Sequence, residues 1–369
     1  MLPSNQPPLV SIVIVNYNGE EVLETCLRSV FDSDYPNFEV IFVDNASTDG
    51  SVKLVKEKFG SDSRLIIILN NKNLGLSEGN NIGIMHAKGE FIVILNNDTE
   101  VDRNWLRELI RVMELDPTIG AAQCKLLRMD DRKRIDSAGV IMDAHGCVMG
   151  RGRIHSLLEI GKASSEIDKG QWDRIEEIFA ALGNSSIFRR TVLYEVGLFD
   201  PKFFVGYEDV DISWRIRLRN YKIVFAPNAI VYHKGTATIS GKGLRWIVKW
   251  HFSKNRIAML IKNYSFRNLV KVMLIIIPVY FLLILFSFNT RASIAYFKGL
   301  AWNVKELNYL VQQRKIVQKS RRVSDDEISR LFSKKCISIQ YILKPYLKVV
   351  QNRVRHNLVQ LLKFLRIKY

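Results

Sequence analysis

The first third of the chain alternates short apolar runs with helix-like segments, and this alternation restricts the fold more than any other feature. Each run holds about six residues rich in Val, Ile and Phe, which is typical of buried strands. Strands and helices that alternate in this way form βαβ units around a mainly parallel sheet. The expected strands are residues 10–15, 38–43, 64–69 and 90–95, and the expected helices are residues 20–31, 51–59 and 77–87.

A polar turn follows each of the expected strands. The carboxyl ends of parallel strands lie at one edge of a sheet, and ligands of open α/β sheets bind at that edge. Four polar turns in these places therefore predict a ligand site. The turns are Asn16-Tyr17-Asn18-Gly19, Asp44-Asn45-Ala46-Ser47, Asn70-Asn71 and Asn96-Asn97-Asp98.

The charge of the chain is concentrated in its last part. The formal net charge is +17, yet the residues from 291 onward hold 18 Lys and Arg against 4 Asp and Glu, so the earlier residues are close to neutral. A length of 369 residues predicts about two domains. The four cysteines lie far apart without a C-x-x-C pair, which disfavours structural zinc and indicates a reducing compartment.

Beyond residue 124 the pattern is less regular. Residues 125–175 are interpreted as an inserted region that shapes an acceptor pocket. Regular structure is then expected as an ordered segment at 178–189, helices around Val192 and at 209–219, and strands at 222–226 and 229–232 that end at His233.

An apolar segment without charge covers residues 272–288. As a helix it spans roughly 25 Å, slightly less than the ~30 Å hydrocarbon core of a bilayer. Pro278 predicts a kink or two half-helices. In the tail, apolar residues recur every three or four positions between Val350 and Leu365, with Lys and Arg among them. This pattern predicts an amphipathic basic helix on anionic lipid.

These features predict a location at the cytoplasmic face of the cell membrane, either monotopic or single-pass. No charged segment precedes the first apolar run, so no signal peptide is expected. A full crossing would separate the basic tail from the body, against the tendency of Lys and Arg to stay cytoplasmic, which favours the monotopic arrangement. The expected division is a body at 1–240, a connecting helix and apolar segment at 241–290 (apolar at about 268–288), and a basic helical tail at 291–369.

Asp44 is placed to accept hydrogen bonds from a nucleobase or a ribose, although an Asp here equally serves as a helix N-cap. Both can hold, with Asp44 on the nucleotide and Asp49 or Ser51 as the cap. The glycine- and amide-rich passage that holds Asn73, Gly75 and Asn81 lets a backbone approach phosphate at a helix N-terminus. A merely tight turn is the alternative. The sequence G-x-G-x-x-G is absent, which disfavours a dinucleotide site.

Asn97 and Asp98 follow the fourth expected strand, at a natural position for a hard cation. Mg²⁺ and Mn²⁺ take few protein oxygens and share the oxygens of a diphosphate. A lone Asp at a strand end is also a common turn residue. A lone histidine such as His233 is more often structural, and it becomes a metal-ligand candidate if it closes on Asp98.

Glu208, Asp209 and Asp211 place three carboxylates at the start of an expected helix. The helix macrodipole stabilises acidic residues there. Three carboxylates packed together nevertheless repel one another unless a cation or a proton-transfer role compensates. The cluster is therefore interpreted as functional, with Trp214 following on the same helix.

In this order, these segments resemble the family 2 glycosyltransferases, inverting enzymes with a GT-A (Rossmann-like) α/β fold and a mainly parallel sheet. Within that family the chain is similar to the rhamnosyltransferase-type members that build cell-surface polysaccharides. The resemblance covers about residues 9–235. Of the family's D-x-D metal motif, Asn96-Asn97-Asp98 retains only the last acid, and Gly206-Tyr207-Glu208-Asp209 resembles its catalytic motif.

The resemblance implies transfer of a sugar from a nucleotide-diphosphate donor to a glycan or polyprenyl-linked acceptor. The apolar segment and the basic tail predict a membrane surface as a further partner, and no nucleic acid is expected. The resemblance also implies Asp209 as general base, Asp98 and His233 as ligands of Mg²⁺ or Mn²⁺, and an acceptor side formed by Glu208, Asp211 and Trp214. The implied nucleotide-sugar-binding residues are Asn16, Tyr17, Asn18, Asp44, Asn73, Gly75, Asn81, Asn97 and Asp98.

Two other function classes compete with this interpretation. A nucleic-acid-binding protein would explain the pI of about 9.7, but the basic residues follow an apolar, membrane-length segment on a near-neutral body. A nucleotidyltransferase shares the need for nucleotide and metal. It would usually carry a Gly-rich loop with Lys or Arg after the first strand, and Asn16-Tyr17-Asn18-Gly19 lacks one.

Overall fold

The first part of the protein forms a parallel sheet whose three inner strands are buried on both faces and whose edge strand is partly exposed. The structure, a computed structural model, describes residues 6–154, 164–235, 245–286 and 291–334. The four expected strands are confirmed with ends shifted by one residue at most, and they lie in the order β3-β2-β1-β4 with parallel pairing. The strands are β1 (Val10–Asn16), β2 (Phe38–Asp44), β3 (Leu65–Leu69) and β4 (Phe91–Asn96).

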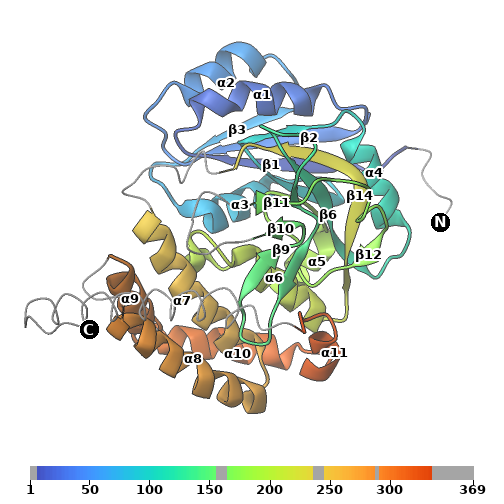
Figure 1. Cartoon of the computed structure of the whole chain (residues 1–369). Helices are drawn as coiled ribbons and strands as arrows, with labels where there is room; N and C mark the ends of the chain where they lie inside the picture. The colour runs from blue at the N-terminus through green and yellow to red at the C-terminus, as the bar shows by residue number, and fades with distance from the viewer. Residues whose placement is uncertain (1–5, 155–163, 236–244, 287–290, 335–369) are drawn as a thin grey trace, which may run out of the picture.

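Helices cover both faces of this sheet (Figure 1). One apolar core joins the even-numbered side chains of β1 to α1, α2 and α4, and a second joins the odd-numbered side chains to α3, α5 and α6. This division follows from the period of two along a strand. The helices are α1 (Glu20–Phe31), α2 (Ser51–Phe59), α3 (Gly75–His86), α4 (Trp105–Glu114), α5 (Arg190–Val196) and α6 (Glu208–Leu218).

The sheet continues beyond β4 with antiparallel β13 (Ser185–Arg189), then β6 (Ile119–Arg128) and β14 (Lys222–His233). It is therefore a mixed sheet, mostly parallel. The two strands expected at 222–226 and 229–232 form the single strand β14, since pairing with β6 resumes after an irregularity between Ala226 and Ile230.

The described part of the region expected as an insertion, 125–175, holds the end of β6 and several short strands, of which β7 extends the main sheet. The short strand β12 after it pairs with β14. The ordered segment expected at 178–189 contains β13, and the helix expected around Val192 is α5. The remaining short strands are β5 (Thr99–Val101), β7 (Ile135–Ser137), β8 (Val140–Met142), β9 (Val148–Gly150), β10 (Arg153–Ile154), β11 (Ser164–Ser165) and β12 (Glu176–Glu177).

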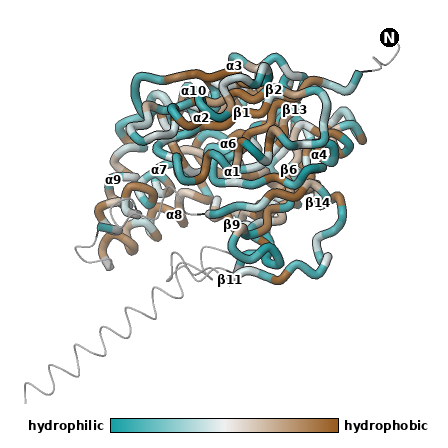
Figure 2. The backbone as a smooth tube through the Cα atoms, turned by 90° about the horizontal axis from the view of Figure 1, so that it is seen from above, coloured by the Kyte–Doolittle hydropathy of each residue, from teal (hydrophilic) through white to brown (hydrophobic). Residues whose placement is uncertain are grey.

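A third apolar core joins α6 to the helices that follow residue 244. In Figure 2, stretches of α8 and α9 carry the colour of hydrophobic residues. Pro278 lies inside a single helix, α8, so the expectation of two half-helices is wrong. The amphipathic tail helix expected at 350–365 lies outside the described residues. The helices are α7 (Arg245–Asn263), α8 (Phe266–Phe286), α9 (Arg291–Lys305), α10 (Leu307–Lys319) and α11 (Asp325–Ser329).

Candidate active site

Asn16 joins the ends of three neighbouring strands at the carboxyl edge of the sheet. Its side chain is fully buried. Its Nδ2 donates to Oδ1 of Asp44 at 2.9 Å, and its Oδ1 accepts from Nδ2 of Asn97 at 2.7 Å. A buried amide that uses both ends in this way holds the two turns at a fixed spacing. The structure thus brings together the polar turns after β1, β2 and β4.

Asp44 shapes the turn after β2. Its Oδ2 accepts from the backbone N of Ser47 at 2.8 Å, and its Oδ1 accepts from the Ser47 hydroxyl at 2.6 Å. The N-cap alternative for Asp44 is wrong, because Gly50 is the N-cap of α2 and no side chain caps it. Asp49 accepts from the first turns of two helices: its Oδ2 from the backbone N of Glu20 in α1 and its Oδ1 from the backbone N of Ser51 in α2, each at 3.1 Å.

Tyr17 and Asn18 stand at the open side of this edge. Asn18 lies in the left-handed region with φ +50°, and its Oδ1 accepts from the backbone N of Thr48 at 2.8 Å. Tyr17 is 40% exposed, so its ring is accessible from solvent. The turns after β1 and β2 therefore form one polar rim with an exposed aromatic ring.

The residues expected beneath a donor have structural partners. Asn73 Oδ1 accepts from the backbone N of Gly75, and a Cβ on Gly75 (φ +79°) would meet the Phe204 ring at 2.5 Å. Asn81 exchanges two hydrogen bonds with the backbone of Phe199, at 2.9 and 3.0 Å. Asn81 thereby fastens α3 to the segment before α6, and its expected role at the donor stays a prediction.

His233 closes on Asp98, as a metal-ligand pair requires. Nε2 of His233 lies 3.3 Å from Oδ1 of Asp98, while its Nδ1 lies 2.8 Å from Oδ2 of Asp136. Burial alone would lower the pKa of the His233 imidazole, but the carboxylates of Asp136 and Asp98 outweigh it and raise the pKa to about 9. The imidazole is therefore positively charged at neutral pH when no cation is bound.

The donor set at this edge fits a divalent cation that also takes ligands from elsewhere. Oδ1 of Asp98 is buried and faces the imidazole Nε2 at 3.3 Å without a hydrogen bond among the described residues, so its lone pairs are available to a cation. Neighbouring ligands of an octahedral ion with bonds of about 2.1 Å are about 3 Å apart, close to the 3.3 Å between Asp98 and His233. No cluster of three or more His, Cys, Asp or Glu suited to a metal occurs in the described part of the chain, so diphosphate or water oxygens would complete the shell.

Glu208 and Asp209 form a carboxylate pair at the first turn of α6. Burial, followed by the negative charge of Asp209, raises the pKa of Glu208 to about 8. Burial also raises the pKa of Asp209, although hydrogen bonds from the backbone N of Gly183 and Val210 oppose this. Asp209 is half-buried and Glu208 is buried. Glu208 is therefore mostly protonated near neutral pH, whereas the two backbone donors favour the ionised form of Asp209.

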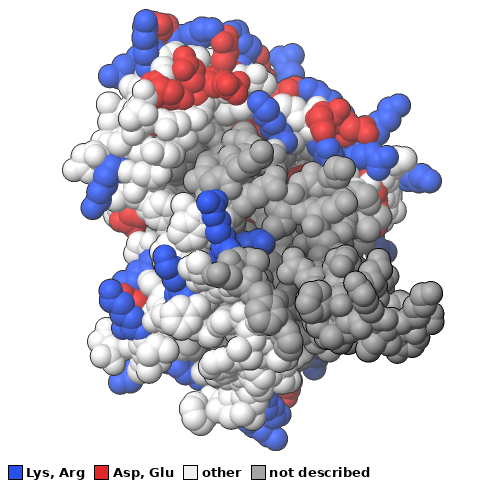
Figure 3. Space-filling view, turned by 60° about the vertical axis from the view of Figure 1, so that its left-hand side comes forward, with Lys and Arg blue, Asp and Glu red and all other residues white. Residues whose placement is uncertain are grey.

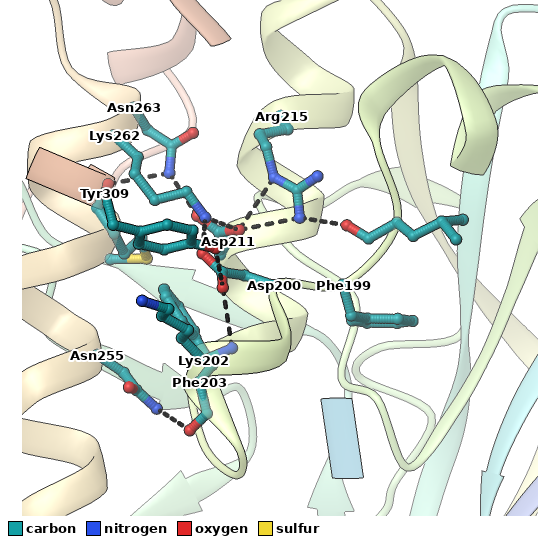
Figure 4. A network of polar contacts seen from close by, with 12 residues as sticks. Phe199, Asp200, Lys202, Phe203, Asp211, Arg215, Asn255, Lys262, Asn263 and Tyr309 are labelled. Atoms are coloured by element: carbon teal, nitrogen blue, oxygen red, sulfur yellow. Dashed lines mark hydrogen bonds and ion pairs between the residues drawn. The ribbon is translucent and has the colours of Figure 1, made fainter. Parts of the chain in front are cut away.

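The side chains of Asp211 and Trp214 are not accessible to an acceptor. Asp211 is fully buried, and its carboxylate is paired with Arg215 and Lys262, each at 2.9 Å. Trp214 is fully buried and packs edge-on against Tyr264, with ring centroids 4.7 Å apart. We therefore correct the acceptor-side assignment of both residues, because contact with an acceptor needs an accessible side chain. Figure 4 shows the polar network around Asp211.

The segment before Asp209 is held in a strained form by two helices. Phe204 and Tyr207 have φ values of +64° and +68°, which side chains bearing a Cβ rarely adopt. The carbonyl of Phe204 accepts from the backbone N of Leu76 in α3 at 2.7 Å, and Asn255 in α7 donates to the carbonyl of Gly206 at 2.6 Å. Asn255 was missed from the sequence, because it lies 46 positions after Asp209 on a helix without a recognisable motif.

Residues 11–193 match the family model described as Glycosyl transferase family 2. The O-antigen biosynthesis protein RfbC of Myxococcus xanthus is 29% identical over 238 residues, 64% of this chain and 18% of that protein. The poly-beta-1,6-N-acetyl-D-glucosamine synthase of Staphylococcus epidermidis is 25% identical over 252 residues, 66% of this chain and 54% of that protein. The chain thus spans between 18% and 54% of the length of these two curated relatives.

A solved structure of GalNAc-T7 with UDP, GalNAc and Mn²⁺ shares the fold. It matches with a TM-score of 0.61 at 18% sequence identity, over 92% of this chain and 59% of that chain. At this identity the likeness concerns the fold alone. Together these comparisons show that residues 11–193 are similar to a glycosyl transferase family 2 domain and that the fold is of the GT-A type.

Proposed function

We propose that the chain transfers a sugar from a nucleoside diphosphate donor to a hydroxyl of a glycan or lipid-linked acceptor, with inversion at the anomeric carbon. The observation that carries the proposal is the half-buried Asp209 carboxylate, held by Gly183 and Val210 beside a buried Glu208. A carboxyl group whose pKa is raised by burial, and whose ionised form is stabilised by two backbone N–H groups, suits a general base.

In the proposed reaction Asp209 takes the proton of the acceptor hydroxyl as that oxygen attacks the anomeric carbon. The bond between this carbon and the diphosphate oxygen breaks, and its electron pair leaves with the diphosphate. Attack from the face opposite the leaving group inverts the configuration. Glu208 stays protonated near neutral pH, so it does not compete with Asp209 for the proton.

Asp98 and His233 are the residues that would hold a divalent ion, Mg²⁺ or Mn²⁺. When bound, such an ion neutralises the negative charge that develops on the diphosphate. Mn²⁺ occurs with UDP in the structure of GalNAc-T7, which supports the choice of metal. Rhamnose is the donor sugar that the resemblance to rhamnosyltransferases suggests, and saturation-transfer NMR with a panel of nucleotide sugars tests it.

The substitution Asp209→Asn tests the proposed base. The amide keeps the shape of the carboxylate but cannot accept the proton, so kcat should fall at least about 100-fold. Donor affinity should stay within a few-fold, because the proposed role of Asp209 is on the acceptor hydroxyl. The matched control is Asp62→Asn, which changes a carboxylate that pairs with Arg64 beside β3. A variant Asp209→Asn with more than about a tenth of the wild-type kcat would disprove the assignment.

We further propose that α8 lies along the cytoplasmic surface of a membrane rather than crossing it. Phe266–Leu285 is long and apolar enough to cross, with a mean hydropathy of 2.4. One face of α8 is nevertheless part of the third apolar core, and the Tyr280 hydroxyl donates to the carbonyl of Ser253 in α7 at 3.1 Å. The opposite face is open to solvent, where Leu274 and Phe281 are 71% and 56% exposed.

The charges around this face match an anionic lipid surface. Arg267 and Lys271 lie on α8, and Arg291, Lys298 and Lys305 lie on α9. Figure 3 shows Lys and Arg at the borders of the uncharged surface in the lower part of the molecule. Each basic residue near anionic lipid contributes about 1 kcal/mol to binding.

Co-sedimentation with anionic and neutral phosphatidylcholine-based vesicles tests the membrane proposal. The double substitution Leu274→Glu with Phe281→Glu should reduce binding to anionic vesicles at least tenfold, whereas Leu115→Glu, which alters an exposed Leu after α4, should not. Equal binding of the two variants would contradict the proposal. A chain that resists alkaline carbonate extraction from cell membranes would be a spanning protein.

A further inference from the structure

We infer that Asp136 is a positioning residue for His233 and so for the proposed metal site. This inference rests on the proposed function, because it concerns the ion that Asp98 and His233 would hold. Asp136 lies in the region 125–175, which the sequence suggested as part of an acceptor pocket. In the structure Asp136 lies in β7, and its carboxylate is beside the imidazole of His233, the last residue of β14.

A β-bulge turns Asp136 toward His233. In the pairing of β6 with β7, Leu126 pairs with Ser137 and Leu127 pairs with Ile135, so Asp136 is the extra residue between them. A bulged residue leaves the regular alternation of the ladder, and bulges often direct a side chain next to a functional site. His233 is the last residue of β14, which pairs with β6 on the other side, at Arg128. The bulge therefore places the Asp136 carboxylate next to the His233 imidazole.

The ring of His233 is fixed at both nitrogens. Its Nδ1 lies 2.8 Å from Oδ2 of Asp136, and its Nε2 faces Oδ1 of Asp98 at 3.3 Å without the geometry of a hydrogen bond. A hydrogen bond donated by Nδ1 to a carboxylate fixes the tautomer, and it leaves the Nε2 lone pair for a cation. The side chain of Asp136 therefore determines which nitrogen is offered to the metal.

Arg153 in turn holds Asp136. Its Nε donates to the backbone carbonyl of Asp136 at 2.7 Å, and its terminal nitrogen donates to Oδ1 of the same residue. Both carboxylate oxygens of Asp136 are thus engaged, one by Arg153 and one by His233. Asp136 is 7% exposed, so it is poorly placed to contact a donor or acceptor directly. Held in this way by Arg153, the Asp136 carboxylate is placed to orient the imidazole of His233.

The test measures Mn²⁺ affinity directly, by electron paramagnetic resonance titration of the full chain with Mn²⁺ alone and with inorganic diphosphate added. Loss of a carboxylate that orients a metal-binding histidine typically weakens the metal 10- to 100-fold, so Asp136→Ala should weaken Mn²⁺ by that factor. Asp136→Asn should stay within a few-fold, since its amide oxygen still accepts from Nδ1. The matched control is Asp130→Ala, which removes an exposed carboxylate paired with Arg128 and should leave the affinity unchanged.

Two further measurements separate the possible failures. If His233→Ala weakens Mn²⁺ but Asp136→Ala does not, the positioning role is wrong while the metal site stands. If neither Asp98→Ala nor His233→Ala changes Mn²⁺ affinity, the metal site of the proposed function is wrong. Nitrogen-15 NMR of the wild-type histidines under saturating Mg²⁺ needs no variant to fold: the proton of His233 should be on Nδ1. A proton on Nε2 would overturn the inference.

Discussion

Lys262 is a buried cation whose removal should destabilise the protein strongly. It is 1% exposed, and its Nζ lies 2.7 Å from Asp200 and 2.9 Å from Asp211 (Figure 4). The substitution Lys262→Met keeps most of the apolar stem and removes the charge. In this variant Asp200 and Asp211 each lose the ion pair with Lys262. Both carboxylates are buried, so water cannot replace that partner.

The expected loss follows from what the two carboxylates retain. Breaking a buried ion pair by removing one partner costs about 3–5 kcal/mol. Asp211 keeps its ion pair with Arg215 and a hydrogen bond from Asn263, and Asp200 keeps a hydrogen bond from Tyr309 at 2.8 Å. Because these partners compensate in part, we expect a loss near the lower end, about 3 kcal/mol.

Urea unfolding followed by tryptophan fluorescence measures this loss, since Trp214 lies in the core next to the network. The control Lys58→Met removes a cation from an exposed pair with Glu24 and should cost less than about 1 kcal/mol. Adding Asp200→Asn to Lys262→Met should restore part of the stability, because it removes one of the buried charges. A loss below about 1 kcal/mol for Lys262→Met would refute the reasoning.

Two further predictions concern the candidate site. The pKa of Glu208 in the folded protein is about 8, above its ordinary 4.5, so its contribution to stability is full below pH 4.5 and is lost as the pH rises through 8. Glu208→Gln should therefore raise the melting temperature relative to wild type at pH 9 and much less at pH 5. Thermal unfolding of both proteins at the two pH values measures this. The same difference in melting temperature at pH 5 and pH 9 would contradict the prediction. Asp98→Ala should steeply raise the Mn²⁺ concentration needed for half-maximal transfer. His233→Ala should raise it less, because a neutral ligand contributes less than a carboxylate to a hard cation. Full wild-type activity in excess EDTA would refute both expectations.

The sequence predicted the features that depend on neighbouring residues. The first four strands and three helices follow from local periodicity, and the polar edge follows from the rule that parallel strands end on the same side. The convergence of Asn16, Asp44 and Asn97 was predictable for this reason. The approach of His233 to Asp98 was stated only as a condition, since it depends on how β14 pairs with β5.

The features that depend on distant partners were not predictable from one sequence. Asp211 looked like part of an acidic site because Lys262, which neutralises it, comes 51 positions later in the chain. The hydrogen bonds of Asn81 were not predictable either, because its partner Phe199 is 118 positions away. Asp136 stood in a stretch without periodicity, and only the pairing register of β7 shows that it is a bulged residue.

The helix α7 connects these observations. Its Asn255 holds the strained segment before Asp209, and its Lys262 neutralises Asp211 two residues after Asp209, so one helix fixes both sides of the proposed base. The expected division at residue 240 therefore lies between Asp209 and the side chains that position it. Ser253, on the same helix, accepts from Tyr280 of α8, two residues before Asn255. If α8 rests on a membrane, a single helix then joins the lipid-facing surface to the segment that carries the base, and a lipid-linked acceptor would approach from that side.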